Sequence, residues 1–214
     1  KRLMNYKYIV IEGNIGAGKT SLANKLTNEY NAKLILEQFE DNPFLPKFYK
    51  DPDKYSFHVE LAFLASRYQQ LNKDLPYQNL FKTFTIADYY FSKSLIFASV
   101  TLSDAEYNLY RQIFNIIYKT LPKPDLYVYI HLPTNRLLEN INKRNRKYEQ
   151  YINESYLKKI QEAYFEFMKK ESDIKIAVID ATNLDFVNKN SDYQKVKSCI
   201  FNKTYNRGYN SVVF

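Results

Sequence analysis

Glycine and cysteine are scarce in this sequence, and long apolar runs are absent. The chain has 4 glycines and 1 cysteine among 214 residues. A lone cysteine, Cys199, cannot form an intramolecular disulfide, so we expect a reducing, cytoplasmic setting. No apolar run reaches the roughly 20 residues of a membrane-spanning helix. Residues 1–5 lead directly into the first predicted strand, so we expect no signal peptide. A disulfide scaffold and a membrane protein are not expected.

Positive charge exceeds negative charge, but it is spread along the chain. There are 31 Lys and Arg against 23 Asp and Glu, a formal net charge of +8. The densest basic run is residues 143–147, and no nucleic-acid-binding motif is present. A basic surface combined with anionic small-molecule substrates explains this charge, so we expect neither nucleic acid nor a membrane as a partner.

Three of the few glycines gather in one motif near the start of the chain. Residues 13–20, GNIGAGKT, fit the phosphate-binding pattern G-x-x-x-x-G-K-[ST]. Residues 6–11 before it read as a buried strand, and residues 20–30 after it have helical spacing. This context suits a phosphate site, because backbone N–H groups close around phosphate oxygens and the helix N-terminus adds partial positive charge.

The motif predicts nucleoside triphosphate binding. Lys19 is expected to reach the β- and γ-phosphates, and Thr20 to offer its hydroxyl to Mg²⁺. The predicted ATP-binding residues of the loop are Gly13, Asn14, Ile15, Gly16, Ala17, Gly18, Lys19, Thr20 and Ser21. A phosphate loop alone does not identify the acceptor of the phosphate.

Strand and helix patterns alternate along the rest of the chain. Further strands are predicted at residues 33–36, 84–88, 126–132 and 174–179. Helices are predicted at residues 43–49, 55–71, 103–118, 135–143, 154–170 and 191–201, with Ser103 and Thr134 as N-caps and a loop at 75–80. This order predicts one α/β domain over residues 1–214 with a five-stranded parallel sheet flanked by helices. The tail, residues 202–214, is left unassigned.

Two carboxylates follow predicted strands, at the sheet edge where ligands of such folds bind. Glu37 follows the second strand and Asp88 ends the third. Phosphoryl transfer needs a metal held near the phosphates and a group that deprotonates the attacking hydroxyl. Glu37 and Asp88 can fill these roles, although either could instead be an ordinary turn or helix cap.

Two further groups of residues point to an acceptor pocket. Arg144 and Arg146 lie between two predicted helices, in a segment (residues 143–153) that could close as a lid over phosphates. The alternative is a solvated helix end. Glu60, Phe63 and Arg67 share one side of the helix at 55–71, offering a carboxylate and an aromatic surface to a planar acceptor. The alternative is a surface ion pair beside core aromatics.

Together these motifs resemble those of the deoxynucleoside kinases, in particular the bacterial deoxyguanosine and deoxyadenosine kinase branch. The resemblance covers residues 7–195 and rests on four motifs in family order: residues 13–21, residues 37–52 (EQFEDNPFLPKFYKDP), residues 88–90 (DYY) and residues 144–149 (RNRKYE). It implies the P-loop kinase fold with an arginine-rich lid. It also implies transfer of phosphate from ATP, with Mg²⁺, to the 5′-hydroxyl of a deoxynucleoside, by a cytoplasmic or organellar homodimer.

The resemblance assigns roles to particular residues. It implies that Glu37 is the general base, that Tyr49 and Glu149 bind the sugar 3′-hydroxyl, and that Glu60 reads the base. The residues it places on the phosphates, the metal and the adenine of ATP are Arg144, Arg146, Asp88, Asp185 and Phe186. The chain departs from the family at Tyr89 and Tyr90, where the family has arginine and serine. Arg67 or Lys93 could supply the missing positive charge.

Glu60 also suggests which base is bound. Guanine presents two neighbouring donors, N1–H and N2–H₂, which suit a carboxylate that only accepts. Adenine N1 is an acceptor, and facing a carboxylate it would lose about 1–3 kcal/mol, roughly ten- to a hundredfold in selectivity. Deoxyguanosine is therefore favoured. The alternatives are a deoxyadenosine or broad-specificity deoxynucleoside kinase, a thymidylate-like nucleoside monophosphate kinase, and a non-catalytic NTP-binding module.

Overall fold

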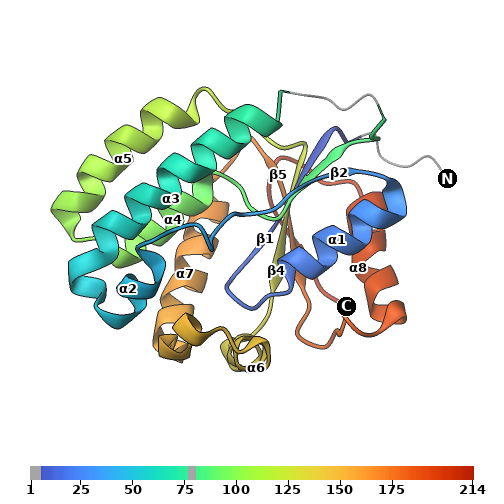
Figure 1. The fold of residues 1–214 in the computed structure, drawn as a ribbon. Helices are drawn as coiled ribbons and strands as arrows, with labels where there is room; N and C mark the ends of the chain where they lie inside the picture. Colours follow the sequence, from blue (N-terminus) through green and yellow to red (C-terminus); the bar gives the residue numbers. More distant parts are fainter. Residues whose placement is uncertain (1–5, 77–80) are drawn as a thin grey trace.

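A computed structural model of the chain describes residues 6–76 and 81–214. Helices cover both faces of one parallel sheet (Figure 1). The predictions for residues 1–5 and for 77–80 of the loop at 75–80 lie outside the described residues. Within the described ranges, no helix combines the length and apolarity that a bilayer crossing requires.

The sheet of the described chain has six strands in the order β2-β3-β1-β4-β5-β6, and all neighbouring pairs are parallel. The strands are β1 (Tyr8–Gly13), β2 (Lys33–Ile35), β3 (Thr85–Ala87), β4 (Leu126–His131), β5 (Lys175–Asp180) and β6 (Gly208–Val212). The α-helices are α1 (Lys19–Tyr30), α2 (Leu45–Lys50), α3 (Pro52–Asp74), α4 (Ser92–Thr101), α5 (Asp104–Tyr118), α6 (Thr134–Arg144), α7 (Glu154–Lys170) and α8 (Asn190–Asn202). A 3₁₀-helix, η1 (Lys147–Tyr151), follows α6.

The prediction of five strands is wrong, because the unassigned tail forms β6. This strand pairs with β5 in register from Lys175 opposite Gly208 to Ile179 opposite Val212. It has one neighbour, and only Val212 in it is buried. An edge strand that is largely exposed does not carry the continuous apolar run of a buried parallel strand. Its sequence therefore gave no strand signal.

The interior strands are buried on both sides of the sheet. In β1, Ile9 and Ile11 pack with α1, α6 and α8, whereas Tyr8 and Val10 pack with α3, α4, α5 and α7. In Figure 1, α1 and α8 lie on one side of the sheet and α3, α4, α5 and α7 on the other. Burial on both faces explains the near-continuous apolar sequence of these strands, as predicted.

The two predicted helix caps had different outcomes. Ser103 caps α5 as predicted, in a capping box with Glu106. Thr134 does not cap α6: Pro133 occupies the cap position, and the Thr134 hydroxyl donates instead to Glu154 (2.7 Å). The α6 start is therefore tied to the first residue of α7.

Candidate active site

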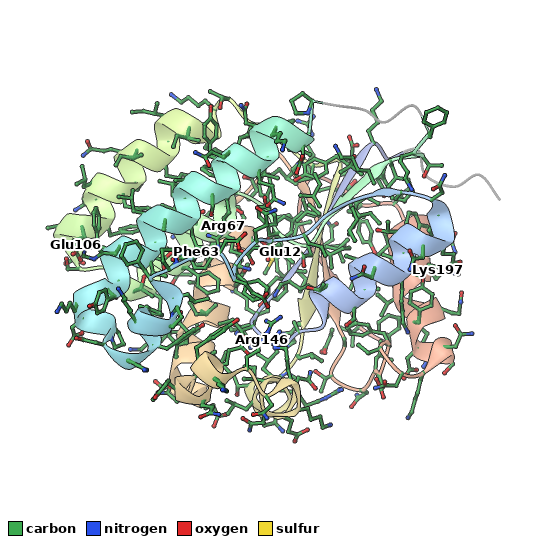
Figure 2. All side chains as sticks on the ribbon, in the orientation of Figure 1. Glu12, Phe63, Arg67, Glu106, Arg146 and Lys197 are labelled. Carbon is green, nitrogen blue, oxygen red and sulfur yellow. The ribbon has the colours of Figure 1, made fainter. Side chains whose placement is uncertain are left out.

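A cleft of about 550 Å³ is lined by the phosphate loop, the segments after β2 and β3, helices α2, α3 and α4, and the lid segment. It contains every residue predicted to contact nucleoside or to close over phosphates: Glu37, Tyr49, Glu60, Phe63, Arg67, Asp88, Arg144, Arg146 and Glu149. Figure 2 shows Phe63 and Arg67 of α3 toward the centre of the molecule, with Arg146 of the lid segment below them. Segments distant in sequence therefore meet at one site.

The glycines of the phosphate loop permit left-handed backbone and close packing against neighbouring segments. Gly18 has φ 82° at the start of α1, and a Cβ added to Gly16 would lie 2.7 Å from the Leu137 carbonyl oxygen. Lys19 Nζ donates to the carbonyl oxygens of Gly13 and Asn14 at 2.9 Å each. Burial lowers the pKa of Lys19 to about 8, and the charge of Lys93 acts in the same direction. The ammonium thus lies folded over its own loop.

Neighbouring helices hold the loop from beneath. The side chain of Asn14 accepts from Ile15 N (2.8 Å) and donates to the Leu157 carbonyl of α7 (2.8 Å). Asn140 of α6 donates to the Gly16 carbonyl (2.8 Å). Residues 15–21 of the loop line the cleft. Gly13 and Asn14, which are also predicted to bind ATP, begin the loop and do not line the cleft. Asn14 therefore shapes the loop from behind.

Asp88 joins the phosphate loop to the segment after β2. Its Oδ2 accepts from the Thr20 hydroxyl (2.6 Å), and its Oδ1 accepts from the Glu37 backbone N–H (2.8 Å). A hydroxyl and a carboxylate at this position fit Mg²⁺, which binds through one or two protein oxygens with phosphates and waters as its other ligands. Across residues 6–76 and 81–214, no group of three or more His, Cys, Asp or Glu side chains could hold a metal. The Thr20 hydroxyl and the Asp88 carboxylate suit a cation whose other ligands are phosphates and waters.

Glu37 is clamped between two cations. Its Oε1 accepts from Arg67 Nε (2.8 Å) and Nη2 (2.6 Å), and its Oε2 accepts from Lys93 Nζ (2.5 Å). Burial alone would raise the pKa of Glu37, but the charges of Lys93 and Arg67 outweigh it and lower the pKa to about 2. The carboxylate is ionised at neutral pH. Arg67 is 3% exposed, so its alternative interpretation as a surface residue is wrong.

The departure from the family motif at Tyr89 and Tyr90 has a structural explanation. Both tyrosines are fully buried. The Tyr89 hydroxyl donates to Gln70 Oε1 of α3 (2.8 Å), and the Tyr90 hydroxyl pairs with that of Tyr118 (3.2 Å). The residues that face Glu37 are Arg67 and Lys93 together, so the structure places both candidate replacements for the absent arginine on the same carboxylate.

The lid arginines are held by the carboxylate predicted to bind the sugar. Arg144 Nη2 and Nε donate to Glu149 at 2.7 and 3.1 Å, and Arg146 Nη1 lies 3.5 Å from the same carboxylate. Glu149 is buried, whereas the arginine side chains remain about one-third exposed. The Tyr49 ring lies parallel to that of Tyr148, with centroids 6.2 Å apart. The lid arginines and the two residues predicted to bind the sugar, Tyr49 and Glu149, therefore line the same part of the cleft.

Glu60 is a buried carboxyl with one free oxygen. It is 3% exposed; its Oε1 accepts from the Thr101 hydroxyl (3.0 Å), and its Oε2 has no hydrogen-bond partner among the described residues. Burial raises the pKa of Glu60 to about 7, against the charge of Arg67 and the Thr101 hydrogen bond. One turn along α3, the Phe63 ring lies under the Arg67 guanidinium (4.6 Å). This end of the cleft combines a carboxyl with a flat aromatic surface.

The loop after β5 touches the phosphate loop through one of its two predicted residues. A Cβ on Gly18 would lie 3.0 Å from the Phe186 ring, and Lys25 donates to the carbonyls of Phe186 and Val187. Phe186 therefore packs beside the ATP loop. Asp185 does not line the cleft: its carboxylate accepts from Asn188 within its own loop.

Sequence reasoning missed Glu12, which is fully buried below the phosphate loop. It accepts from Tyr90 N and from the Tyr164 hydroxyl, both at 2.9 Å. Burial raises its pKa, which the charges of Lys93 and Lys19 oppose. The sequence offered one indication of its role: Glu12 is a charged residue that directly follows the apolar residues of β1. Thr101, 41 residues from its partner Glu60, had no such signal.

A phosphate loop, strand-end carboxylates and lid arginines around one cleft define a P-loop phosphotransferase. The family model described as deoxynucleoside kinase matches residues 9–205. The chain is 36% identical over 193 residues to a deoxyguanosine kinase of Bacillus subtilis (strain 168), covering 88% of this chain and 93% of the relative. It is 32% identical over 199 residues to a deoxyadenosine kinase of Dictyostelium discoideum, covering 92% and 81%.

Among solved structures, a deoxyadenosine kinase from M. mycoides with bound dATP matches with a TM-score of 0.77 and 26% identity, over 89% of this chain and 97% of that one. The chain belongs to the deoxynucleoside kinase family. The predicted family, P-loop kinase fold and kinase activity are confirmed.

Proposed function

We propose that this kinase transfers the γ-phosphate of Mg²⁺-ATP to the 5′-hydroxyl of a purine deoxynucleoside, with deoxyguanosine preferred. The observation that carries the base assignment is the Glu60 carboxyl, a buried group in the wall of the cleft whose Oε2 has no hydrogen-bond partner among the described residues. Relatives named as deoxyguanosine and deoxyadenosine kinases support a purine acceptor.

The donor binds at the phosphate loop. Loop N–H groups and the N-terminus of α1 surround the phosphates, and Lys19 leaves the loop carbonyls to pair with them. Thr20 and Asp88 would hold Mg²⁺, which would neutralise charge on the phosphates. Phe186, beside Gly18, packs near the adenine of ATP.

The acceptor hydroxyl approaches Glu37. Phosphoryl transfer depends mainly on positioning and electrostatic stabilisation, so the carboxylate orients the 5′-hydroxyl and accepts its proton as the new bond forms. Arg67 and Lys93 hold Glu37 in place. Arg144 and Arg146 close over the transferring phosphate, where guanidinium groups neutralise developing charge.

The sugar and base occupy the remaining walls of the cleft. Tyr49 and Glu149 bind the 3′-hydroxyl, and Phe63 packs against the planar base. Ionised Glu60 accepts from guanine N1–H and N2–H₂, a pattern that adenine cannot offer. A carboxylate facing adenine N1 leaves that contact unpaired, at about 1–3 kcal/mol.

An ATP-coupled assay over the four deoxynucleosides tests this proposal. We expect deoxyguanosine to give the highest kcat/KM, and Glu60→Gln to shift the deoxyguanosine-to-deoxyadenosine ratio roughly ten- to a hundredfold toward deoxyadenosine. Glu166→Gln, on the exposed face of α7, is the matched control. An unchanged ratio in Glu60→Gln would remove Glu60 as the base reader.

Two further measurements, acceptor preference and ATP binding without turnover, separate the alternative functions. A nucleoside monophosphate kinase would prefer deoxynucleotides over deoxynucleosides as acceptors. A non-catalytic NTP-binding module would bind ATP without turnover on either. The homodimer, the cytoplasmic location, the single-domain organisation and the closing movement of the lid remain predictions.

A further inference from the structure

The hydroxyl of Thr101 stands between two acceptors. Its Oγ lies 3.0 Å from Glu60 Oε1 and 3.0 Å from the Phe97 carbonyl oxygen, one turn earlier in α4. A hydroxyl carries one proton and also accepts, so it can donate to only one of these oxygens at a time. It can donate to Glu60 when that group is a carboxylate. When Glu60 is protonated, the hydroxyl can donate to Phe97 and accept from the acid. Thr101 therefore satisfies both protonation states.

Several charged and titratable groups face Glu60 from the elements packed around it. They are Arg67 of α3, Glu37 after β2, Lys93 of α4, Tyr49 of α2, Tyr110 of α5 and Tyr156 of α7. Neither cation bonds to Glu60, because both are paired with Glu37. Tyr110 donates to the Glu60 backbone carbonyl (3.2 Å) and leaves the carboxyl free. Among the described residues, Thr101 is thus the hydrogen-bond donor to this side chain.

We infer that Thr101 is a specificity-determining positioning residue: by donating to Oε1 it holds Glu60 as a carboxylate and leaves Oε2 to the base, so that this hydrogen bond and the proton on Glu60 decide between guanine and adenine. The inference rests on the proposed function.

The two forms of Glu60 present different hydrogen-bonding patterns. The carboxylate accepts from both guanine donors, N1–H and N2–H₂. The carboxylic acid has a single proton: with adenine bound, Oε2 can donate that proton to N1 while Oε1 accepts from N6–H₂, and the Thr101 hydroxyl then no longer accepts from the acid. With the pKa of Glu60 at about 7, both forms are populated near neutrality, and a single hydrogen bond shifts the balance.

The test is the ratio of kcat/KM for deoxyguanosine over deoxyadenosine, measured with both nucleosides in competition between about pH 5.5 and about pH 8.5, on either side of the pKa of Glu60. Ionisations shared by both reactions, such as that of Lys19, cancel in this ratio. We expect the wild-type ratio to rise with pH by roughly tenfold or more. Glu60→Gln should give a low ratio that does not change with pH.

Thr101→Val keeps the shape of the side chain and removes the donor. Loss of a hydrogen bond to the charged form raises the pKa of an acid. The midpoint of the pH dependence should therefore move upward by about one unit, and the ratio at pH 7 should fall roughly three- to tenfold. Thr101→Ser, which keeps the hydroxyl, should restore the wild-type profile. Ser99→Ala, which removes a hydroxyl whose partner among the described residues is the Ile96 carbonyl of the same helix, is the matched control.

Calorimetry of deoxyguanosine binding gives a readout independent of turnover. Below the pKa of Glu60, binding should release up to one proton, measured from the dependence of binding enthalpy on buffer ionisation enthalpy. Glu60→Gln should release none.

A wild-type ratio that is constant with pH would overturn the inference, as would a Thr101→Val profile that coincides with that of Ser99→Ala. In both cases purine phosphorylation and the proposed function would stand. Absence of turnover with any deoxynucleoside would instead overturn the proposed function and the inference with it.

Discussion

The Thr20 hydroxyl lies 2.6 Å from Asp88 Oδ2, so the first turn of α1 and the end of β3 share a hydrogen bond. The other oxygen of Asp88 accepts from the Glu37 backbone N–H (2.8 Å). Asp88 therefore fixes the phosphate loop and the Glu37 backbone relative to each other. A cation bound with ATP would use the same two side chains, Thr20 and Asp88.

Removal of the Thr20 hydroxyl tests this arrangement. Thr20→Val loses both the bond to Asp88 and a cation ligand, while Thr20→Ser keeps the hydroxyl. Hydrogen bonds to charged groups contribute about 1.5–3 kcal/mol, so kcat/KM for Mg²⁺-ATP should fall roughly ten- to a hundredfold in Thr20→Val. Steady-state kinetics over a magnesium titration provide the measurement. Equal activity of the two variants would exclude the hydroxyl from this role.

Glu37→Gln should separate catalysis from nucleoside binding. Loss of a general base lowers kcat by about 10²–10⁴, while binding of deoxyguanosine measured by calorimetry should change little. The exposed Glu166→Gln again provides a matched control. Turnover within a few-fold of wild type would show that Glu37 does not accept the proton.

The Arg67–Glu37 pair should also contribute to stability. Breaking a buried pair leaves a charge uncompensated; because Lys93 still contacts Glu37, we expect Arg67→Met to cost on the order of 3 kcal/mol. For a chain of this size, the midpoint of thermal unfolding should fall by about 6–12 °C. The double variant Arg67→Met/Glu37→Gln should recover part of this loss. Additive losses would mean that the two side chains do not interact.

Glu60 should make the ligand-free protein less stable as the pH rises. Burial raises the pKa of Glu60 from 4.5 to about 7, so the folded state binds this proton more tightly than the unfolded chain does. The stability that the folded state gains from binding this proton is fully present below about pH 4.5 and is lost as the pH rises through 7. A shift of this size corresponds to at most on the order of 3 kcal/mol. Urea unfolding between pH 5 and pH 8 should therefore show a weaker decline in Glu60→Gln than in wild type; parallel curves would contradict the assigned pKa.

Strand β6 should protect the sheet edge. Deleting residues 206–214 removes buried Val212 and exposes the backbone N–H and C=O groups of β5, a template for pairing between molecules. We expect the free energy of unfolding to fall by on the order of 3 kcal/mol and the protein to aggregate in a concentration-dependent way. Thermal unfolding measures the first effect and light scattering the second. Deleting only residues 213–214, which are mostly exposed, is the control. A soluble, equally stable deletion would show that β6 is dispensable.

The motifs and the strand order identified the cleft because parallel strands bring their carboxyl ends to one edge. Glycine spacing located the phosphate loop, and Glu37 and Asp88 followed from strand ends. The contacts that depend on packing between helices could not be predicted. Lys93 meets Glu37 across 56 residues, which requires the placement of α4 against the segment after β2. Thr101 meets Glu60 across 41 residues, which requires the placement of α4 against α3. Asn14 matches the loop pattern, but its burial results from packing against α7, where its side chain donates to the Leu157 carbonyl, and this contact could not be predicted.

If Arg144 and Glu149 act as proposed, their ion pair connects the two substrate sites energetically. Under the roles proposed for them, phosphates that attract Arg144 free Glu149 for the sugar hydroxyl, and a sugar that engages Glu149 frees Arg144 for the phosphates. Thermodynamic linkage then requires each substrate to tighten binding of the other by the same factor. Under these proposed roles, Arg144 would stay with Glu149 while the nucleoside is absent, and hydrolysis of ATP by water would be slow.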